Sequence, residues 1–287
     1  MKKLLTLLFV SSLFLACNDG DIIITSFDFE DSDLENCGEI GNYVFFKINN
    51  NAQESISLKL NTTDSLFWKT KTNTYTLDGT TKFVNYRKYD ADLTSAYFCN
   101  SVPPIAPLVT VEYLGTSGTA TIITTVTRED NDGVEETNLT LDTDGDGIPN
   151  YYDDDDDGDN IPTAAELGDD PTNPKDTDGD SIPDYLDEDD DNDLILTRNE
   201  DLNGNLNPLD DVTAPSEIPN YLNPDVTTET VINEYRSHTY DLSSDIIVQV
   251  LNVVLINSEE QINQEVLDFG DKTDVLNTTV TKTPVFQ

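Results

Sequence analysis

Basic residues are scarce in this chain of 287 residues, which carries 15 Lys and Arg against 57 Asp and Glu and has a formal net charge of −42. Such an excess of negative charge excludes nucleic acid and anionic lipid headgroups as expected partners, because their phosphates would be repelled. It favours the binding of cations. Histidine, methionine and tryptophan occur once each, which leaves little room for histidine-based metal sites or histidine-assisted catalysis.

Long hydrophobic runs are also scarce. The run at 4–16 is too short to span a bilayer, but it fits the hydrophobic region of a secretory signal peptide, and Lys2 and Lys3 precede it. Its end, Leu13-Phe14-Leu15-Ala16-Cys17, resembles a bacterial lipobox, in which a small residue precedes the cysteine that becomes the lipidated N-terminus. The resemblance implies lipidation at Cys17 and a bacterial outer-membrane lipoprotein at the cell surface. An ordinary signal peptide cut elsewhere is the alternative.

Cysteine occurs three times, as Cys17, Cys37 and Cys99. If Cys17 takes lipid, the other two form an even pair in an oxidising compartment, which predicts a disulfide between them. That bridge would close a loop of roughly 60 residues and stabilise the fold by on the order of 4 kcal/mol. Two buried free thiols are the alternative.

The acidic residues gather in the middle of the chain. Residues 142–225 contain 28 of the 57 Asp and Glu but only two basic residues, Lys175 and Arg198. The flanks have the charge balance of an ordinary secreted domain. We therefore expect four segments: a lipoprotein signal peptide over 1–16, a β-sandwich part over 17–140, an acidic repeat region over 141–225, and a C-terminal β segment over 226–287 that completes the sandwich.

Both flanks have the pattern of antiparallel strands. Ile56, Leu58 and Leu60 alternate with polar residues, which is the period of a strand with one buried face. Asp78-Gly79 and Asp132-Gly133 are hairpin-turn signals. Further strands are expected at 23–29, 75–77, 80–86, 109–114, 119–127, 230–240, 245–256 and 260–269. The expected fold is mainly β, most simply an antiparallel sandwich that is discontinuous in sequence; two small β modules joined by the acidic region are the alternative.

The acidic region is repetitive. Residues 142–153 and 176–187 read DTDGDGIPNYYD and DTDGDSIPDYLD, at an offset of 34, and a fixed period marks a repeat. Within each loop, carboxylates occupy positions 1, 3, 5 and 12, the spacing of a Ca²⁺ loop that adds the backbone carbonyl of position 7. The template fits five times, least well in the fifth loop. The candidate ligands, loop by loop, are Asp142, Asp144, Asp146, the Ile148 carbonyl and Asp153; Asp155, Asp157, Asp159, the Ile161 carbonyl and Glu166; Asp176, Asp178, Asp180, the Ile182 carbonyl and Asp187; Asp189, Asp191, Asp193, the Ile195 carbonyl and Glu200; and Asn199, Asp201, Asn203, the Asn205 carbonyl and Asp210.

Some residues of the region fit the template poorly. Position 6 calls for a residue that tolerates a sharp turn, and Leu194 in the fourth loop is the least suited to it. A sixth copy at 212–223 keeps the frame but lacks acids at the ligand positions. Four acids outside the template are expected to be solvated or to lie behind the ligands: Asp154, Asp156, Glu188 and Asp190.

The phrase Asp-x-Asp-x-Asp-Gly-Ile-Pro, the segment 166–176 and the alternating offsets of 13 and 21 residues between loops resemble thrombospondin type 3 repeats. The resemblance covers about 80 residues. It implies an extended rod in which about four to five Ca²⁺ ions replace a hydrophobic core, together with a role in cell adhesion. A solvated acidic linker that binds cations diffusely is the alternative.

Other chemistry has little support in the sequence. His238 occurs without a Cys or Ser partner motif and is expected to be a surface or packed residue, and Trp68 is expected in the core unless it stacks on a sugar. We therefore expect a non-enzymatic, calcium-binding lipoprotein of the cell surface with a structural or adhesive role toward an unknown protein or glycan. A carbohydrate-capture accessory lipoprotein, whose sandwich binds glycan, is the alternative.

Overall fold

The computed structural model describes residues 27, 29–102 and 104–286. The lipidation site Cys17 lies outside these residues, as does the expected strand at 23–29 except for Phe27 and Phe29. The described chain is mainly β, as predicted, with 36% strand and 9% helix. Among the described residues, no helix is long and apolar enough to cross a membrane.

One antiparallel sheet holds all eight described strands, in the order β1-β2-β3-β5-β6-β7-β8, with β4 also paired to β6. The strands are β1 (Glu35–Cys37), β2 (Tyr43–Asn49), β3 (Glu54–Leu60), β4 (Lys71–Thr76), β5 (Lys82–Tyr89), β6 (Val109–Glu129), β7 (His238–Ile256) and β8 (Gln261–Lys282). The helices are α1 (Ala96–Cys99) and α2 (Thr163–Glu166), with the 3-10 helices η1 (Asn150–Tyr152), η2 (Asp184–Leu186), η3 (Thr197–Glu200), η4 (Pro208–Asp210) and η5 (Asn220–Leu222).

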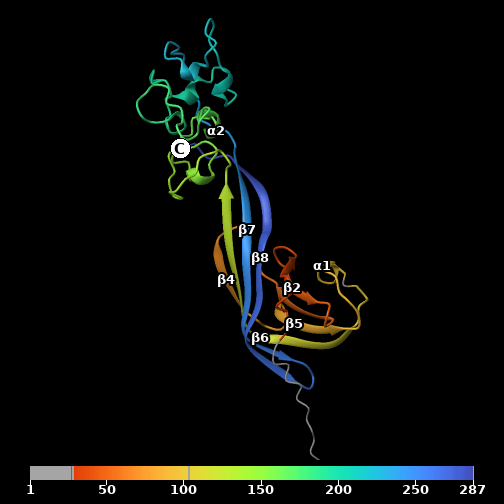
Figure 1. Ribbon diagram of the computed structural model, residues 1–287. Coiled ribbons are helices and arrows are strands. Elements are labelled where there is room, and N and C mark those ends of the chain that lie inside the picture. Colours follow the sequence, from red (N-terminus) through yellow and green to blue (C-terminus); the bar gives the residue numbers. More distant parts are fainter. Residues whose placement is uncertain (1–26, 28, 103, 287) are drawn as a thin grey trace, which may run out of the picture.

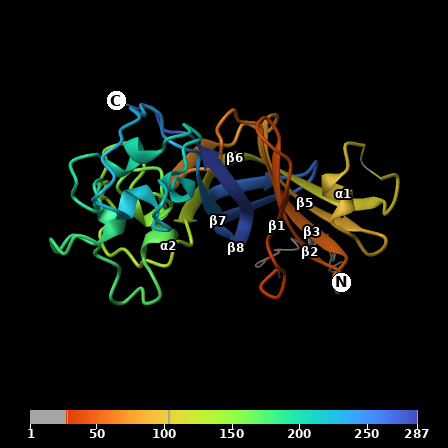
Figure 2. The same cartoon turned by 90° about the horizontal axis from the view of Figure 1, so that it is seen from above.

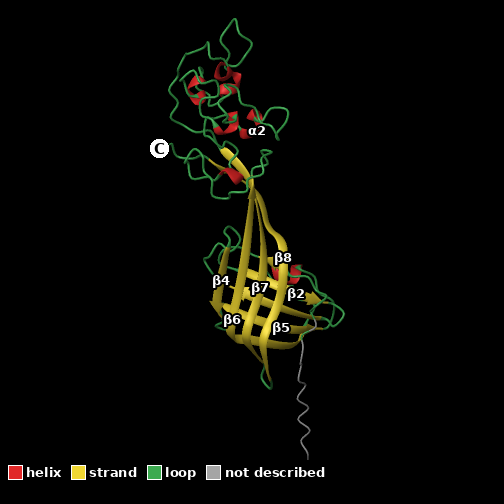
Figure 3. Ribbon diagram, turned by 60° about the vertical axis from the view of Figure 1, so that its left-hand side comes forward, coloured by secondary structure: helices red, strands yellow, loops and turns green. Residues whose placement is uncertain are grey.

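The three longest strands are β6, β7 and β8, and the acidic middle of the chain connects β6 to β7 at one end of them. β6 pairs with β7 from Leu114 opposite Ile256 to Glu129 opposite Asp241, so the two β flanks share one sheet. The upper ends of these strands extend beyond the rest of the sheet, and the chain between β6 and β7 lies beyond those ends (Figure 1, Figure 3).

The Asp78-Gly79 turn does not form the predicted hairpin. β4 pairs with residues 119–124 of β6, whereas β5 pairs with residues 109–115 of the same strand. β4 and β5 therefore run in the same direction, end to end, along one edge of β6. Asp78 accepts hydrogen bonds from the backbone N–H groups of Thr80, Thr81 and Lys82. These bonds close a small loop within the edge without reversing the chain.

Further differences from the expected strands lie in β1 and β2, which fall outside the expected ranges, in β8, which continues beyond 269 to Lys282, and around β6 and β7. The strands expected at 109–114 and 119–127 are one strand, with an irregular register between Gly115 and Thr119. Asp132-Gly133 forms no hairpin, because β6 ends at Glu129 and the chain then enters the acidic loops. Residues 230–237 are not a strand, and β7 begins only at His238.

A single apolar core fills the inside of the curled sheet, which is nearly closed in the manner of a barrel or sandwich. Its members come from both flanks, because Ile122 of β6 and Val250 of β7 are both fully buried. In β7, Ile246, Val248 and Val250 are buried at alternate positions, which is the period of a strand with one face on the core. Trp68, expected in this core, is instead 44% exposed.

The predicted disulfide is present. Cys37 at the end of β1 and Cys99 at the end of α1 form the bond, with a Cα–Cα distance of 5.6 Å across 62 residues of sequence. Beside it, the ring of Phe98 stacks on Phe46 at a centroid distance of 4.3 Å. The bridge therefore fastens the α1 loop to the edge of the sheet.

Candidate metal centres in the acidic segment

The acidic segment, residues 130–237, contains α2, the five 3-10 helices and loops. Seen from above, it lies to one side of β1, β2, β3 and β5 (Figure 2). The extended rod expected from the sequence is not what the structure shows. Asp190 of the fourth loop reaches acids of the second loop, and residues 229–236 run back along the second and fourth loops, which they contact through Asn160 and Asn199.

Four of the predicted loops share one backbone geometry, in which positions 4 and 6 have positive φ. These pairs are Gly145 and Gly147, Gly158 and Asn160, Gly179 and Ser181, and Asn192 and Leu194. Leu194 adopts the required conformation with φ 80° and leaves its side chain 84% exposed. A leucine there is strained, because its Cβ crowds the backbone at positive φ. The loop template nevertheless holds at the position where the sequence suits it least.

A recurring brace of two hydrogen bonds, which the acid spacing does not predict, closes each of these loops. The backbone N–H of position 2 donates to the side chain of position 9, and the N–H of position 9 donates to the carbonyl of the residue before position 1. The position-9 residues are all buried: Asn150, Thr163, Asp184, Thr197 and, in the degenerate copy, Asn220. The signal in the sequence is a small polar residue seven positions after the second residue of each loop. The degenerate copy therefore keeps the brace without the acids.

Each carboxylate at positions 3 and 5 accepts a backbone hydrogen bond from its own loop through one of its two oxygens. The N–H of position 5 donates to the position-3 carboxylate, and the N–H of position 7 donates to the position-5 carboxylate, in all four loops. In three loops the other oxygen of these side chains is buried and has no hydrogen-bond partner: Asp144, Asp146, Asp157, Asp159, Asp191 and Asp193. Buried carboxylate oxygens without a donor are costly unless a cation meets them.

The predicted ligands converge within the loops. In three groups one oxygen from each acid lies within 4.8 Å of the others: Asp142, Asp144 and Asp146; Asp157, Asp159, Glu166 and Asp190; and Asp176, Asp178 and Asp180. In the fourth loop, burial raises the pKa of Glu200 to about 9, with Asp191, Asp193 and Asp189 adding to the effect. The closing acid of that loop therefore also lies among its predicted partners. Asp187, the closing acid of the third loop, has its pKa raised by burial and by Asp180 and Asp178.

Burial and mutual repulsion dominate the electrostatics of these groups. Burial raises the pKa of Asp153 to about 9, and Asp146 and Asp155 raise it further. The pKa values of Asp157 and Asp159 are likewise raised well above the ordinary range, first by burial and then by neighbouring carboxylates. A bound cation would reverse both effects, because its positive charge stabilises the ionised carboxylates that burial and mutual repulsion destabilise.

The acids that converge in the second loop are not the same set as its predicted ligands. Asp155 is fully buried, but its Oδ2 lies 3.0 Å from Nε of Arg236, and Asp155 is not in the group around Asp157. Asp190 joins that group instead, although it was expected to be solvated or to lie behind the ligands. Asp190 is 1% exposed, and neither of its carboxylate oxygens has a hydrogen-bond partner. The reason is tertiary, since the fourth loop folds against the second.

The other acids outside the template have different surroundings. Asp154 forms an ion pair with Arg236, with 3.0 Å between Oδ1 and Nη2. Glu188 is exposed, as expected, and lies 3.6 Å from Arg198. Asp156, in contrast, is 2% exposed, and burial raises its pKa to about 9. Of the two placements expected for Asp156, solvated or behind the ligands, its burial excludes the first.

The fifth loop begins two residues later than predicted. Asp201 accepts hydrogen bonds from the N–H groups of Gly204 and Leu206, as Asp142 does from positions 4 and 6 of the first loop. Gly204 and Leu206 also have the positive φ of those positions. Asp201 is therefore position 1, which moves Asn203 and Asn205 to positions 3 and 5. Their side-chain amides both donate to Asp210.

Asn199, predicted as the first ligand of the fifth loop, has a different role. It is buried, its side-chain Oδ1 accepts from the N–H of Ile232, and its backbone carbonyl accepts from the N–H of Thr230. Asn160 of the second loop holds the returning chain in a similar way, since it accepts from the N–H of Arg236 and donates to the carbonyl of Glu234. These two asparagines fasten residues 229–236 to the loops.

The burial of the isoleucine side chain at position 7 differs from loop to loop. Ile148 and Ile161 are fully buried, whereas Ile182 is 44% exposed and Ile195 is half-buried. The first two loops thus contribute apolar side chains to the interior of the segment. The role of the four carbonyls as ligands stays a prediction.

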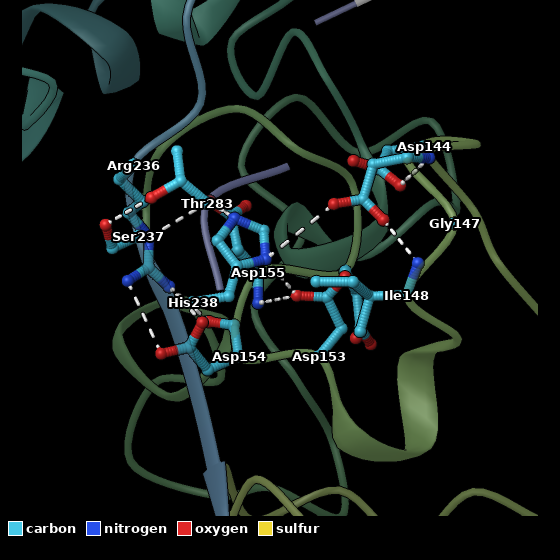
Figure 4. A network of polar contacts seen from close by, with 12 residues as sticks. Asp144, Gly147, Ile148, Asp153, Asp154, Asp155, Arg236, Ser237, His238 and Thr283 are labelled. Carbon is cyan, nitrogen blue, oxygen red and sulfur yellow. Dashed lines mark hydrogen bonds and ion pairs between the residues drawn. The ribbon is translucent and has the colours of Figure 1, made fainter. Parts of the chain in front are cut away.

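His238, the first residue of β7, is buried at the base of the first two loops (Figure 4). Its Nδ1 forms a hydrogen bond of 2.5 Å with Oδ1 of Asp153, and its Nε2 lies 3.7 Å from Oδ2 of Asp155. Burial lowers the pKa of this imidazole. The histidine is packed, which is one of the two placements expected, and it links the start of β7 to the closing acid of the first loop.

The donor set suits a hard divalent cation. Nearly all ligand atoms in these clusters are carboxylate oxygens, which are the ligands preferred by Ca²⁺ and Mg²⁺. The clusters named above, all within the described residues, contain no sulfur ligand of the kind that softer metals prefer. Several buried acidic groups can therefore hold a metal ion. Comparison of the chain with known protein families, curated proteins and solved structures finds no match in any of the three.

Proposed function

We propose that the acidic segment binds Ca²⁺ in its loops and that the ions hold it folded. The observation that carries this proposal is the set of buried carboxylate oxygens at positions 3, 5 and 12 that have no hydrogen-bond partner. The backbone N–H groups already satisfy one oxygen of each of the position-3 and position-5 side chains and orient the other. Four or five ions would then supplement the few buried apolar side chains of this segment, which contributes no residue to the apolar core of the sheet.

Calcium suits these loops better than magnesium does. Ca²⁺ accepts six to eight oxygen ligands in flexible geometry, whereas Mg²⁺ demands a near-ideal octahedron and gives up its water reluctantly. Each loop supplies several acids on a flexible backbone, with a closing acid at position 12. We expect affinities of about 10⁻⁵ to 10⁻³ M, because binding must also order the loop.

The sheet places the acidic segment far from the first described residues. Phe27 packs against Tyr86 of β5 at a ring-centroid distance of 4.7 Å, and Tyr86 pairs with Tyr113 near the start of β6. The acidic segment follows Glu129, 16 residues further along the same strand. At about 3.3 Å per residue, the separation along the strand is about 50 Å.

This separation supports a role at the cell surface. If lipid at Cys17 anchors the chain in the bacterial outer membrane, the sheet lifts the calcium-binding segment away from the bilayer. We propose that the protein is a non-enzymatic surface lipoprotein with a structural or adhesive role, and that the loaded segment meets an unknown protein or glycan. Loss of fatty-acid labelling in Cys17→Ser tests the anchor; labelling that persists in this variant would contradict it.

Limited proteolysis tests the calcium proposal. In chelator, we expect rapid cleavage within residues 142–211, because the buried acids repel one another without a cation. Millimolar Ca²⁺ should protect this region, while the sheet resists in both conditions because an apolar core holds it. A cleavage pattern that calcium does not change, together with no heat of binding, would show that the loops are only an acidic linker.

Carbohydrate capture by the sheet is the second candidate, and the exposure of Trp68 favours it. A tryptophan that is 44% exposed offers its ring to solvent, and sugar rings stack on such faces. A glycan array probed with the full chain tests this candidate. Binding that disappears in Trp68→Ala and persists in chelator would place the activity at the loop between β3 and β4 rather than on the acidic loops.

A further inference from the structure

Three acids meet where β6 enters the acidic segment, outside the predicted loop ligands. Asp132 and Glu136 follow the end of β6, and Asp156 is position 2 of the second loop. One carboxylate oxygen from each lies within 4.8 Å of the other two. Two segments that are 20 residues apart in sequence thus bring their carboxylates to one point.

Each side chain of this junction cluster has at least one buried carboxylate oxygen without a hydrogen-bond partner. Asp156 is 2% exposed, and neither of its carboxylate oxygens has a hydrogen-bond partner. Asp132 is 7% exposed; its Oδ1 accepts from the N–H of Val134, but its Oδ2 has no partner, and neither does Oε1 of Glu136. The basic side chains of the described chain form no ion pair with any of the three acids. A buried carboxylate without a hydrogen-bond donor or a positive charge beside it is costly, and a bound cation would remove this cost.

The repeat relates this cluster to a predicted calcium site. Asp132 lies 34 residues before Glu166, and Asp156 lies 34 residues before Asp190. Glu166 and Asp190 themselves converge, in the group around the second loop. The same offset of 34 separates the first and third loops. The end of β6 therefore supplies the acid that a preceding repeat would otherwise contribute.

We propose that Asp132, Glu136 and Asp156 bind an additional divalent cation, with Ca²⁺ as the expected ion, and that this ion fastens the end of β6 to the second loop. The inference deepens the proposed function and rests on it, because the second loop must fold to place Asp156. With three protein acids, the site needs water or backbone oxygens to complete its coordination. It should therefore fill at higher calcium concentration than the loops.

The first test counts bound ions. Equilibrium dialysis of the full chain against saturating Ca²⁺ should find one ion fewer in Glu136→Gln than in the unaltered protein, and no change in Glu135→Gln, whose side chain is exposed. Asp178→Asn, in the third loop, should lose a different ion and serves as the reference. If Glu136→Gln binds as many ions as the unaltered protein, the junction site is wrong while the loops stand. If the unaltered protein binds none, the proposed function fails as well.

A second test does not depend on the ion count. Glu136→Gln removes a repelling charge in chelator but a ligand in calcium. Its melting temperature should therefore rise above that of the unaltered protein in chelator and fall below it in calcium. A purely structural role would move both melting temperatures in the same direction, and that result would overturn the inference. Asp132→Asn should repeat the crossing pattern.

Discussion

The brace in the second loop can be removed with almost no change of shape. Thr163 is fully buried, and its Oγ1 accepts the backbone N–H of Asp156 at 3.0 Å. Thr163→Val replaces the hydroxyl by a methyl group and leaves that N–H buried without an acceptor. An unsatisfied buried donor costs about 1–3 kcal/mol. The loss falls on the folded loop, because water satisfies the same N–H when the loop is open.

Calcium affinity measures this loss, because binding and folding of the loop are expected to be coupled. At about 1.4 kcal/mol per tenfold change, the second loop of Thr163→Val should bind Ca²⁺ about 5- to 150-fold more weakly. Competition with a chromophoric chelator resolves the affected ion, since the other loops keep their braces. The sheet should melt as before in this variant.

Thr172→Val is the matched control. Thr172 is exposed, and its hydroxyl donates to Asp170 in a turn outside the loops. An exposed substitution of this kind changes stability by at most about 0.5 kcal/mol, or about twofold in affinity. Equal calcium affinities in the two variants would refute the reasoning, because the brace would then contribute nothing to the calcium-bound loop.

Other regions lead to three further expectations. Gly118→Ala should destabilise the sheet by about 1–3 kcal/mol in thermal melts, because Gly118 has φ 121° and a Cβ would lie 2.8 Å from a carbonyl oxygen of β7; Gly41→Ala, at positive φ but in open space, should cost less. Reduction of the Cys37–Cys99 bridge should lower the free energy of unfolding by on the order of 4 kcal/mol, and a denaturant midpoint unmoved by reductant would contradict this. Burial raises the pKa of Asp144 to about 7, so the calcium-free fold keeps a proton that the unfolded chain releases near pH 4. Stability in chelator should therefore fall as the pH rises from about 4 through 7, and calcium affinity should rise over that range; titration calorimetry that detects no proton release at pH 6 would oppose it.

Local features of this protein can be predicted from its sequence. The positions of four acidic loops follow from acids and turn-forming residues within 12 positions, and the backbone hydrogen bonds of these loops form within the same span. Strand periodicity predicted a mainly β fold, and the even count of the two remaining cysteines predicted their disulfide. The frame of the fifth loop was misjudged because Asn199 resembles a ligand, although Asp201 begins the turn.

Tertiary structure decided which distant segments meet. Periodicity identifies a strand but not its partner, so the alignment of β4 and β5 along one edge of β6 could not be read from the Asp78-Gly79 turn. Asp156 and Asp190 have no local signal, because their surroundings come from the end of β6 and from the second loop. The burial of His238 against Asp153 depends in the same way on two residues that are 85 positions apart in sequence. Charge and hydrogen bonding act through space, and only the folded chain sets those distances.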